Sequence, residues 1–260
     1  MMNANFKEER LRRIMEAIQQ NGLVTVAQLS QHFNVSDVTV RRDLRELAAQ
    51  GLLHRAHGGA ILTSPVSPEP PVIQRMQKDE HCKKLIGRAA AALVSDGESV
   101  FIGSGSTTAH VARCLATRKG LTVVTNAINV ATELANAEAV TIVVTGGMMR
   151  SSELSLVGHI AEQALRELRV DKVILGMRAI SIPDGMTNDY LPEVMTDRTI
   201  IEMAPQLVLV ADHSKFGKIA SAYVAPVQRV TTLVTDAETD PATLAELREA
   251  GVRVIVAREL

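Results

Sequence analysis

Apolar positions recur at helical spacing three times within the first fifty residues. The spacing predicts one helix over 8–20, a second over 25–33 and a third that begins at Asp37 after a tight turn. Two short strands are expected over 52–62, on either side of a glycine pair. Three short helices followed by a hairpin indicate a winged helix-turn-helix.

The third predicted helix has one apolar stripe and several arginines elsewhere. Ser36 is its expected N-cap. Arg42 lies opposite the stripe, and arginine can clamp phosphate or read guanine. An ordinary amphipathic helix with a solvated basic face shows the same pattern, so this helix alone leaves both interpretations open. The stripe consists of Val40, Leu44, Leu47 and Ala48; the candidate DNA-binding residues are Ser36, Thr39, Arg41, Arg42 and Arg45, with Arg55 and His57 on the wing.

From residue 98 onward, short apolar runs alternate with helical stretches. This rhythm predicts an α/β domain with a mainly parallel sheet, so the expected fold class is a small N-terminal winged helix-turn-helix followed by a larger, mainly parallel α/β domain. The expected strands are 99–102, 121–125, 140–145, 172–176, 207–211, 230–235 and 252–256, and the expected helices are 107–116, 128–136, 159–168, 193–203 and 241–250.

A proline-rich stretch marks the boundary between the two domains. Four of the nine residues in 63–71 are proline, which forbids helix and favours an extended spacer. We therefore expect a first domain over 1–62, a linker over 63–78 and a second domain over 79–260.

Glycines, hydroxyls and charged groups follow several of the predicted strands. In open α/β sheets, ligands bind beyond the carboxyl ends of the strands. After the first strand, Gly103–Thr108 reads GSGSTT and opens into a helix, which suits close approach of an anion. Convergence on one small polyhydroxylated anion is expected, with tight turns and helix caps as the alternative. The further candidates at strand ends are Thr125, Asn126, Gly146, Gly147, Asp212 and Lys215.

Charge and cysteine content narrow the function. The net charge is −1, divided as +2 over 1–60 and −3 over 61–260, which favours a modest, salt-sensitive DNA footprint. Cys82 and Cys114 lie far apart without ligand spacing, so reduced thiols and no metal site are expected. No signal peptide and no apolar run of about 20 residues is apparent, so we expect a cytoplasmic protein without membrane contact.

These residues resemble the DeoR family of bacterial transcriptional regulators. The resemblance implies operator binding, usually as a repressor of a carbohydrate-catabolism operon, and a C-terminal domain related to ribose-5-phosphate isomerase that senses phosphorylated sugars. It also implies that Ser106–Thr108 cradles the phosphate while Asn126, Asp212 and Lys215 contact hydroxyls or phosphate. The matching residues are Ser36, Thr39, Arg41–Leu44, Gly51, Arg55 and His57–Ala60 in the first domain, and Gly105–Thr107, Val124–Asn126, Gly146, Gly147, Ser155–Gly158, Gly185, Asp212 and Ser214–Gly217 in the second.

Two departures from the family pattern border the expected ligand site. Gly103 stands where the family often has Asp, and Arg178 stands where a smaller, glycine-containing loop is usual. We hypothesise that Arg178 engages a second anionic group of the ligand. A surface arginine in a loop is the alternative.

Three functions compete. The favoured one is a non-enzymatic regulator without cofactor that binds double-stranded operator DNA and a sugar-phosphate-like effector, as a homodimer or tetramer. A sugar-phosphate isomerase would need a positioned general base, for which Asp212 is the strongest candidate and Asp184 and Asp189 are alternatives. In the third, the second domain only oligomerises a constitutive DNA-binding protein.

Overall fold

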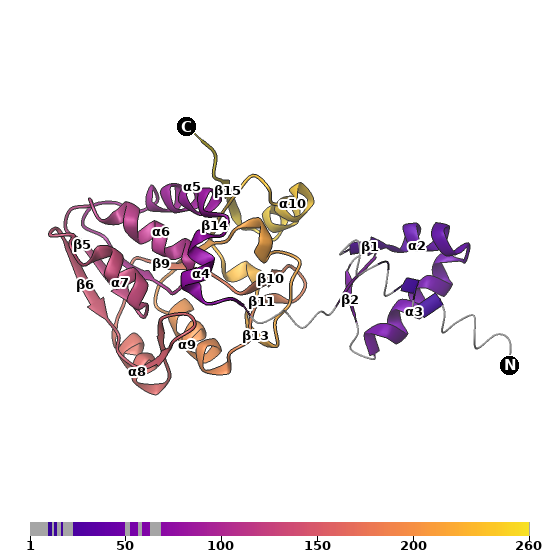
Figure 1. Cartoon of the computed structure of the whole chain (residues 1–260), viewed down its shortest axis with the longest axis horizontal. Helices are drawn as coiled ribbons and strands as arrows, with labels where there is room; N and C mark the ends of the chain where they lie inside the picture. Colours follow the sequence, from indigo (N-terminus) through magenta and orange to yellow (C-terminus); the bar gives the residue numbers. More distant parts are fainter. Residues whose placement is uncertain are drawn as a thin grey trace. The chain divides into compact units, whose positions relative to one another are not determined.

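The computed structural model describes residues 10–11, 13–14, 17, 23–49, 53–56, 59–62 and 69–259. The chain forms two compact units, 1–67 and 68–260 (Figure 1).

The first unit is a winged helix-turn-helix, as the apolar spacing predicted. Its described parts of 10–17 are helical, and its strands form an antiparallel sheet in the order β1-β3-β2. The pairing of β1 with the wing was not predicted, because three residues are too few to show strand alternation and their partner lies far along the chain. The elements are β1 (Leu23–Thr25), α2 (Val26–Phe33), α3 (Asp37–Ala49), β2 (Leu53–Ala56) and β3 (Gly59–Leu62).

Local chemistry fixes the turn between α2 and α3. Thr25 and Gln28 form a reciprocal capping box at the start of α2. Asn34 ends that helix in the left-handed region, with φ of 51°. The predicted N-cap is confirmed, since the backbone N–H of Thr39 donates to Ser36 Oγ at 3.3 Å.

The apolar stripe of α3 packs inward. Val40, Leu44 and Leu47 are buried, which confirms the predicted orientation of the helix; the side chain of Ala48 lies outside the described residues. The remaining buried members of this core are Ile14, Val26 and Leu29.

The second unit is built on a seven-stranded parallel sheet, and each of the seven predicted apolar runs forms one of its strands. The strand order is β15-β14-β12-β9-β4-β5-β6. The strands are β4 (Ser99–Ile102), β5 (Leu121–Thr125), β6 (Val140–Val144), β9 (Lys172–Leu175), β12 (Gln206–Val210), β14 (Thr232–Thr235) and β15 (Arg253–Val256).

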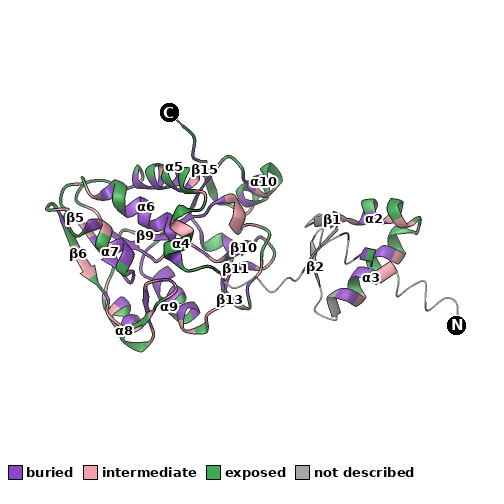
Figure 2. Cartoon of the chain, in the orientation of Figure 1, coloured by how far each residue is buried: buried purple, intermediate pink, exposed green. Residues whose placement is uncertain are grey.

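Helices cover both faces of this sheet. Val100 and Ile102 point towards α5, α6 and α7, whereas Phe101 points into the opposite core with α8, α9 and α10. Helix α6 is buried along most of its length because α4 (Val72–Gln77), α5 and α7 surround it (Figure 2). The helices are α5 (Glu80–Ala91), α6 (Ser106–Leu115), α7 (Ile128–Leu134), α8 (His159–Glu167), α9 (Leu191–Ile201) and α10 (Pro241–Glu249).

Several short elements were not predicted. Residues 72–77, placed within the linker by sequence, form a two-turn helix, α4, whose Val72 is fully buried in the second unit. The others are strands and 3-10 turns of three or four residues, too short for a periodic signal. They are the hairpin of β7 (Met148–Arg150) and β8 (Ser155–Val157), the antiparallel sheet of β10 (Ala179–Ser181), β11 (Gly185–Asn188) and β13 (Ala222–Ala225), and the 3-10 turns η1 (His213–Lys215) and η2 (Val227–Arg229).

The strand order reverses direction beside β4. Strands β5 and β6 follow on one side of β4, whereas β9, β12, β14 and β15 follow on the other. The connections leaving β4 and β9 therefore diverge and leave a crevice at their carboxyl ends, which is where ligands bind in such sheets. Among the described residues, no helix is both long enough and apolar enough to cross a membrane.

Candidate functional site

A cavity of about 60 Å³ lies at this point of the sheet. Its walls include the segment 104–108 after β4, residues 176–178 after β9, and Lys215 beyond β12. A water molecule needs about 10–15 Å³ of such volume. The cavity therefore has room for several waters or a compact polar group.

The N-terminal end of α6 opens on this cavity. Gly105, the residue before the helix, has φ of +141° and no side chain to cap the first turn. Its carbonyl accepts hydrogen bonds from Thr108 Oγ1 and from Asn129 Nδ2, both at 3.1 Å. The loop is thus held from two sides while the first-turn N–H groups, which have no acceptor within the helix, are available to an anion.

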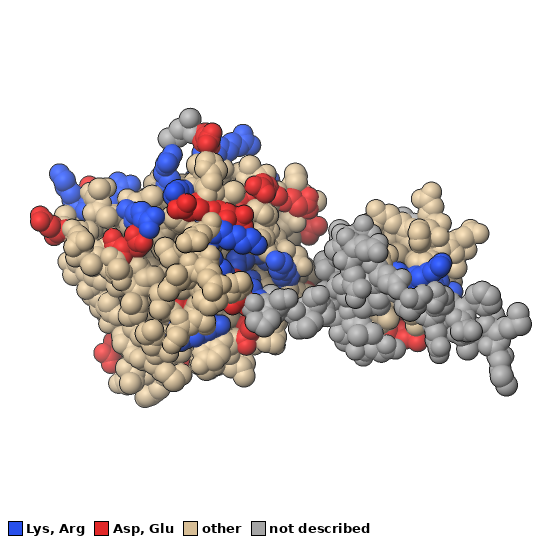
Figure 3. Space-filling model, viewed as in Figure 1, with Lys and Arg blue, Asp and Glu red and all other residues tan. Residues whose placement is uncertain are grey.

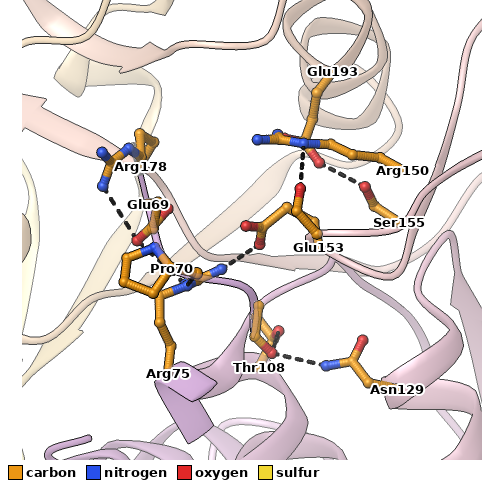
Figure 4. Close-up of polar contacts among 12 residues, drawn as sticks. Glu69, Pro70, Arg75, Thr108, Asn129, Arg150, Glu153, Ser155, Arg178 and Glu193 are labelled. Carbon is orange, nitrogen blue, oxygen red and sulfur yellow. Dashed lines mark hydrogen bonds and ion pairs between the residues drawn. The ribbon is translucent and has the colours of Figure 1, made fainter. Parts of the chain in front are cut away.

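Three cations meet one carboxylate on a second wall. Glu69 Oε1 lies 3.3 Å from Arg75 Nη1 and 3.3 Å from Arg178 Nη1 (Figure 4). It also accepts a hydrogen bond from Lys215 Nζ. Burial alone would raise the pKa of Glu69, but the charges of Lys215, Arg75 and Arg178 outweigh it and hold the pKa below its ordinary value. The Arg178 side chain is only 11% exposed, so it is not the solvated surface arginine of the alternative interpretation.

A third wall combines acids with an amide and a guanidinium. Glu193 accepts hydrogen bonds from Arg150, from Ser155 Oγ at 2.8 Å and from Asn188 Nδ2 at 3.3 Å. The same Asn188 amide donates to Asp197 Oδ2 at 3.0 Å. Burial, reinforced by the charge of Glu193, raises the pKa of Asp197 well above its ordinary value. An acid of this kind can donate a hydrogen bond while its neighbour accepts one.

Glu153 joins these walls from the β7–β8 hairpin. It accepts an ion-paired hydrogen bond from Arg75, and its Oε1 is buried without a hydrogen-bond partner (Figure 4). Burial raises the pKa of Glu153 in spite of the charge of Arg75. The adjacent Leu154 has φ of 53°, a strained conformation for a branched residue in the turn that presents this carboxyl group.

The structure brings some of the predicted ligand residues together and leaves others outside. Ser104, Gly105, Ser106, Thr107, Thr108, Arg178 and Lys215 line the cavity, whereas Gly103, Thr125, Asn126, Gly146, Gly147 and Asp212 do not. The loops after β5 and β6 lie on the far side of β4 from the strand reversal, which explains most of this difference. At Gly103, an added Cβ would lie 2.5 Å from Leu175 Cδ1, so this position faces the core.

Several residues outside the cavity position those inside it. Asn126 Nδ2 donates to Leu156 O at 3.1 Å and so holds the hairpin that carries Arg150 and Glu153. Asp212 accepts from the backbone N–H of Ser214 at 3.0 Å and caps the turn that carries Lys215. These contacts give structural roles to residues that the sequence placed in contact with ligand.

Sequence reasoning missed seven polar residues of the cavity. A signal existed for two of them, because Glu193 and Asp197 are one helical turn apart on α9 and therefore share a face. The others come from short or irregular segments whose approach to the cavity depends on the tertiary fold. The seven are Glu69, Arg75, Arg150, Glu153, Asn188, Glu193 and Asp197.

In the first unit, α3 presents its arginines away from the core. Arg41, Arg42 and Arg45 are exposed, as the helical spacing predicted. Asp43 is fully buried and accepts from Arg10 Nε at 2.6 Å, so this member of the RRDL sequence is structural. The Ser36 and Thr39 hydroxyls lie 3.0 Å apart within the helix cap. His57 and the side chain of Arg55 lie outside the described residues.

No group of three histidines, cysteines, aspartates or glutamates suited to a metal ion occurs in the described part of the chain. Cys82 and Cys114 are free thiols.

A helix-turn-helix unit followed by an α/β unit with a charged cavity at the strand reversal defines a ligand-responsive DNA-binding regulator. Residues 10–66 match the DeoR-like helix-turn-helix domain, and residues 78–237 match the DeoR C terminal sensor domain. The chain belongs to the DeoR family, as its sequence resemblance indicated.

Named relatives align over most of both chains. The glycerol-3-phosphate regulon repressor of Escherichia coli strain K12 is 37% identical over 86% of this chain and 88% of its own. The transcriptional repressor AccR of Agrobacterium fabrum is 33% identical over 90% and 92%. Ribose 5-phosphate isomerase A of Methanocaldococcus jannaschii shares 19% identity over 54% of this chain and 56% of its own, with a TM-score of 0.41, a likeness too remote to inform on activity.

Proposed function

We propose that this protein represses a carbohydrate-catabolism operon and responds to a phosphorylated sugar or related metabolite bound in the cavity of its second unit. The observation that carries the proposal is the cavity itself, where the N-terminal end of α6 faces the same space as three arginines and Lys215. Relatives named as repressors, one of them of a glycerol-3-phosphate regulon, support the class of regulator and of ligand.

In this proposal the two ends of the cavity bind different parts of the ligand. The loop Ser104–Thr108 and the cations Arg178 and Lys215 bind the phosphate. Glu193, Asn188 and Asp197 bind the hydroxyl groups, since two carboxyl groups, one with its pKa raised by burial, and an amide together offer acceptors and donors. Asn126 and Asp212, which were also predicted, hold the segments that form these walls through hydrogen bonds to the backbone.

We propose that α3 reads operator DNA. Its exposed Arg41, Arg42 and Arg45 carry the base and phosphate contacts, with Ser36 and Thr39 at its N-terminal end and Arg55 and His57 on the wing. The chain would then divide into a DNA-binding domain over 1–62 and a sensor domain that includes the second unit, 68–260, so that the linker is shorter than the 63–78 expected from the sequence. Repression of an operon places the protein in the cytoplasm.

A homodimer or tetramer would place two copies of α3 on a two-fold-related operator. The surface over α7 and α8 carries few charged side chains (Figure 3). Met148, Met149 and Ile160 are between 48% and 65% exposed, and exposed apolar side chains of this size favour self-association. Sedimentation of the full chain tests this proposal, and a monomer at micromolar concentration contradicts it.

We propose binding without catalysis. Asp212, the strongest predicted base for an isomerase, does not line the cavity, and its Oδ1 already accepts hydrogen bonds from Ser214. Each carboxyl group that does line the cavity has a partner among arginine, lysine, serine and asparagine, and of their buried oxygen atoms only Oε1 of Glu153 is left without one. Incubation of the purified protein with ribose 5-phosphate should yield no ketose phosphate, and turnover would contradict the proposal.

Gel retardation tests the central function. The full chain should retard DNA from upstream of its own operon and release it on addition of one phosphorylated sugar, while the unphosphorylated sugar has no effect. Retardation that no phosphorylated sugar changes would instead support a constitutive DNA-binding protein.

A further inference from the structure

The segment 69–77 forms part of the cavity wall and is fixed to the sensor unit at several points. The backbone N–H of Val72 donates to Ser152 O at 2.7 Å. Lys83 Nζ of α5 donates to Arg75 O at 2.8 Å, and within the segment Arg75 Nε donates to Pro70 O at 2.9 Å. These bonds hold both Glu69 and Arg75 in the cavity.

The surroundings of Glu69 are those expected around a bound anion. One carboxylate oxygen faces a guanidinium from α4, a guanidinium from the loop after β9 and the ammonium of Lys215. The Glu69 side chain is 11% exposed, so these interactions are weakly screened by solvent. A ligand anion cannot reach the same three cations while this carboxylate occupies the space between them.

We propose that Arg75, Arg178 and Lys215 form the anion subsite of the effector cavity, and that Glu69 fills this subsite until a dianionic ligand displaces it. The inference rests on the proposed function and identifies Glu69 as the residue that selects the ligand. In the absence of effector, Glu69 is then one of two anionic partners of Arg178, whose Nε also donates to Asp189 Oδ2 at 2.9 Å.

Competition with Glu69 sets the class of ligand. A tethered carboxylate acts at high effective concentration, so a free monoanion that takes its place gains no charge and loses translational freedom. A phosphate monoester carries nearly two charges at neutral pH and therefore gains attraction to all three cations on exchange. Glu69 thereby selects phosphorylated sugars over sugar acids of the same frame.

Displacement also links the cavity to the rest of the chain. Glu69 is the second residue of the sensor unit, which begins at Pro68 directly after the DNA-binding unit ends. A ligand that expels Glu69 frees the point at which the chain enters the sensor unit. The ligand can shift the equilibrium between the states with Glu69 in the subsite and with Glu69 displaced only by the difference between its binding free energies for the two states.

The test uses the full-length protein and two small anions, inorganic phosphate and acetate, at constant ionic strength. Thermal unfolding is followed as each anion is titrated from 1 to 100 mM, because a ligand of the native state raises the midpoint. In Glu69→Gln, phosphate should act at a concentration at least tenfold lower than in wild type. In Glu69→Ala, acetate should raise the midpoint by occupying the vacated space, while it leaves wild type unchanged.

Glu98→Gln is the matched control. Glu98 pairs with Lys172 outside the cavity, and its loss should leave both titrations as in wild type. The inference is overturned if phosphate acts on Glu69→Gln at the wild-type concentration, or if acetate fails to stabilise Glu69→Ala. If the Glu69 variants fail these tests but a sugar phosphate still releases the wild-type protein from the operator, the proposed function stands and only the role of Glu69 is wrong. If Glu69→Gln responds to tenfold less phosphate but no sugar phosphate releases the wild-type protein from the operator, the anion subsite is supported and the proposed regulatory function is contradicted.

Discussion

Replacement of Lys215 by methionine measures how strongly the cavity attracts phosphate. The Lys215 ammonium pairs with Glu69, and the cap formed by Asp212 holds the turn that carries it. Methionine keeps most of the side-chain volume and removes the charge. In the free protein, Lys215→Met removes an attraction to the singly charged Glu69. With effector bound, it removes an attraction to a phosphate that carries nearly two charges. The difference, which sets the change in effector affinity, is about one unit of charge.

The size of the effect follows from Coulomb's law. At a separation of about 4 Å and an effective dielectric constant of about 20, one unit of charge is worth about 4 kcal/mol. The Lys215 side chain is 16% exposed, so solvent screening and relaxation reduce this figure. A loss of about 2 kcal/mol remains, which corresponds to an effector affinity lowered about 30-fold.

Isothermal titration with the sugar phosphate that releases the operator provides the measurement. Lys172→Met is the control, because Lys172 is similarly buried, at 12% exposure, and pairs with Glu98 away from the cavity. We expect this control to bind as wild type does, and Lys215→Met to retain its operator affinity. An effector affinity of Lys215→Met within twofold of wild type would refute the electrostatic reasoning.

The remaining predictions concern the reading helix, its support and the acid wall of the cavity. Arg42→Ala should weaken operator binding by about 1–3 kcal/mol in a gel-shift titration with the fold intact, and unchanged affinity would show that Arg42 does not face DNA. Asp43→Asn removes the buried partner of Arg10 and should destabilise the first unit by about 3 kcal/mol in urea unfolding; equal destabilisation of the second unit would contradict this. Because the pKa of Asp197 is raised by burial, its contribution to stability is complete below the unfolded pKa and is lost as pH rises through the folded pKa. Asp197→Asn should therefore match wild type near pH 4 and become the more stable protein by pH 8, and a difference that does not grow with pH would disprove the shift.

Local patterns in the sequence were sufficient for most of the fold. Each strand of the parallel sheet is a short apolar run, and the caps at Ser36 and Asn34 depend on neighbours in the chain. The β7–β8 hairpin and the sheet of β10, β11 and β13 were not predicted, since strands of three or four residues carry too little periodicity.

Besides Arg178 and Lys215, the cavity was predicted only at the single segment that follows β4. The loop at Gly105 combines a glycine, hydroxyls and a helix start within a few residues, and all of these are visible in sequence. Asn126 does not line this cavity, because strand order decides which loops meet, and periodicity does not contain that order. Glu69 and Glu153 reach the cavity from a proline-rich segment and a tight turn, where nothing local distinguishes a ligand-facing carboxylate from a solvated one.

Linkage between the two units tests the account most directly. The operator affinity of the full chain is measured at increasing concentrations of the effective sugar phosphate, and the affinity for that sugar phosphate is measured with and without saturating operator. If the cavity controls the reading helix, both affinities change by the same factor, because coupling between two sites is reciprocal. A sugar phosphate that binds tightly in the cavity yet leaves the operator affinity unchanged would contradict the account.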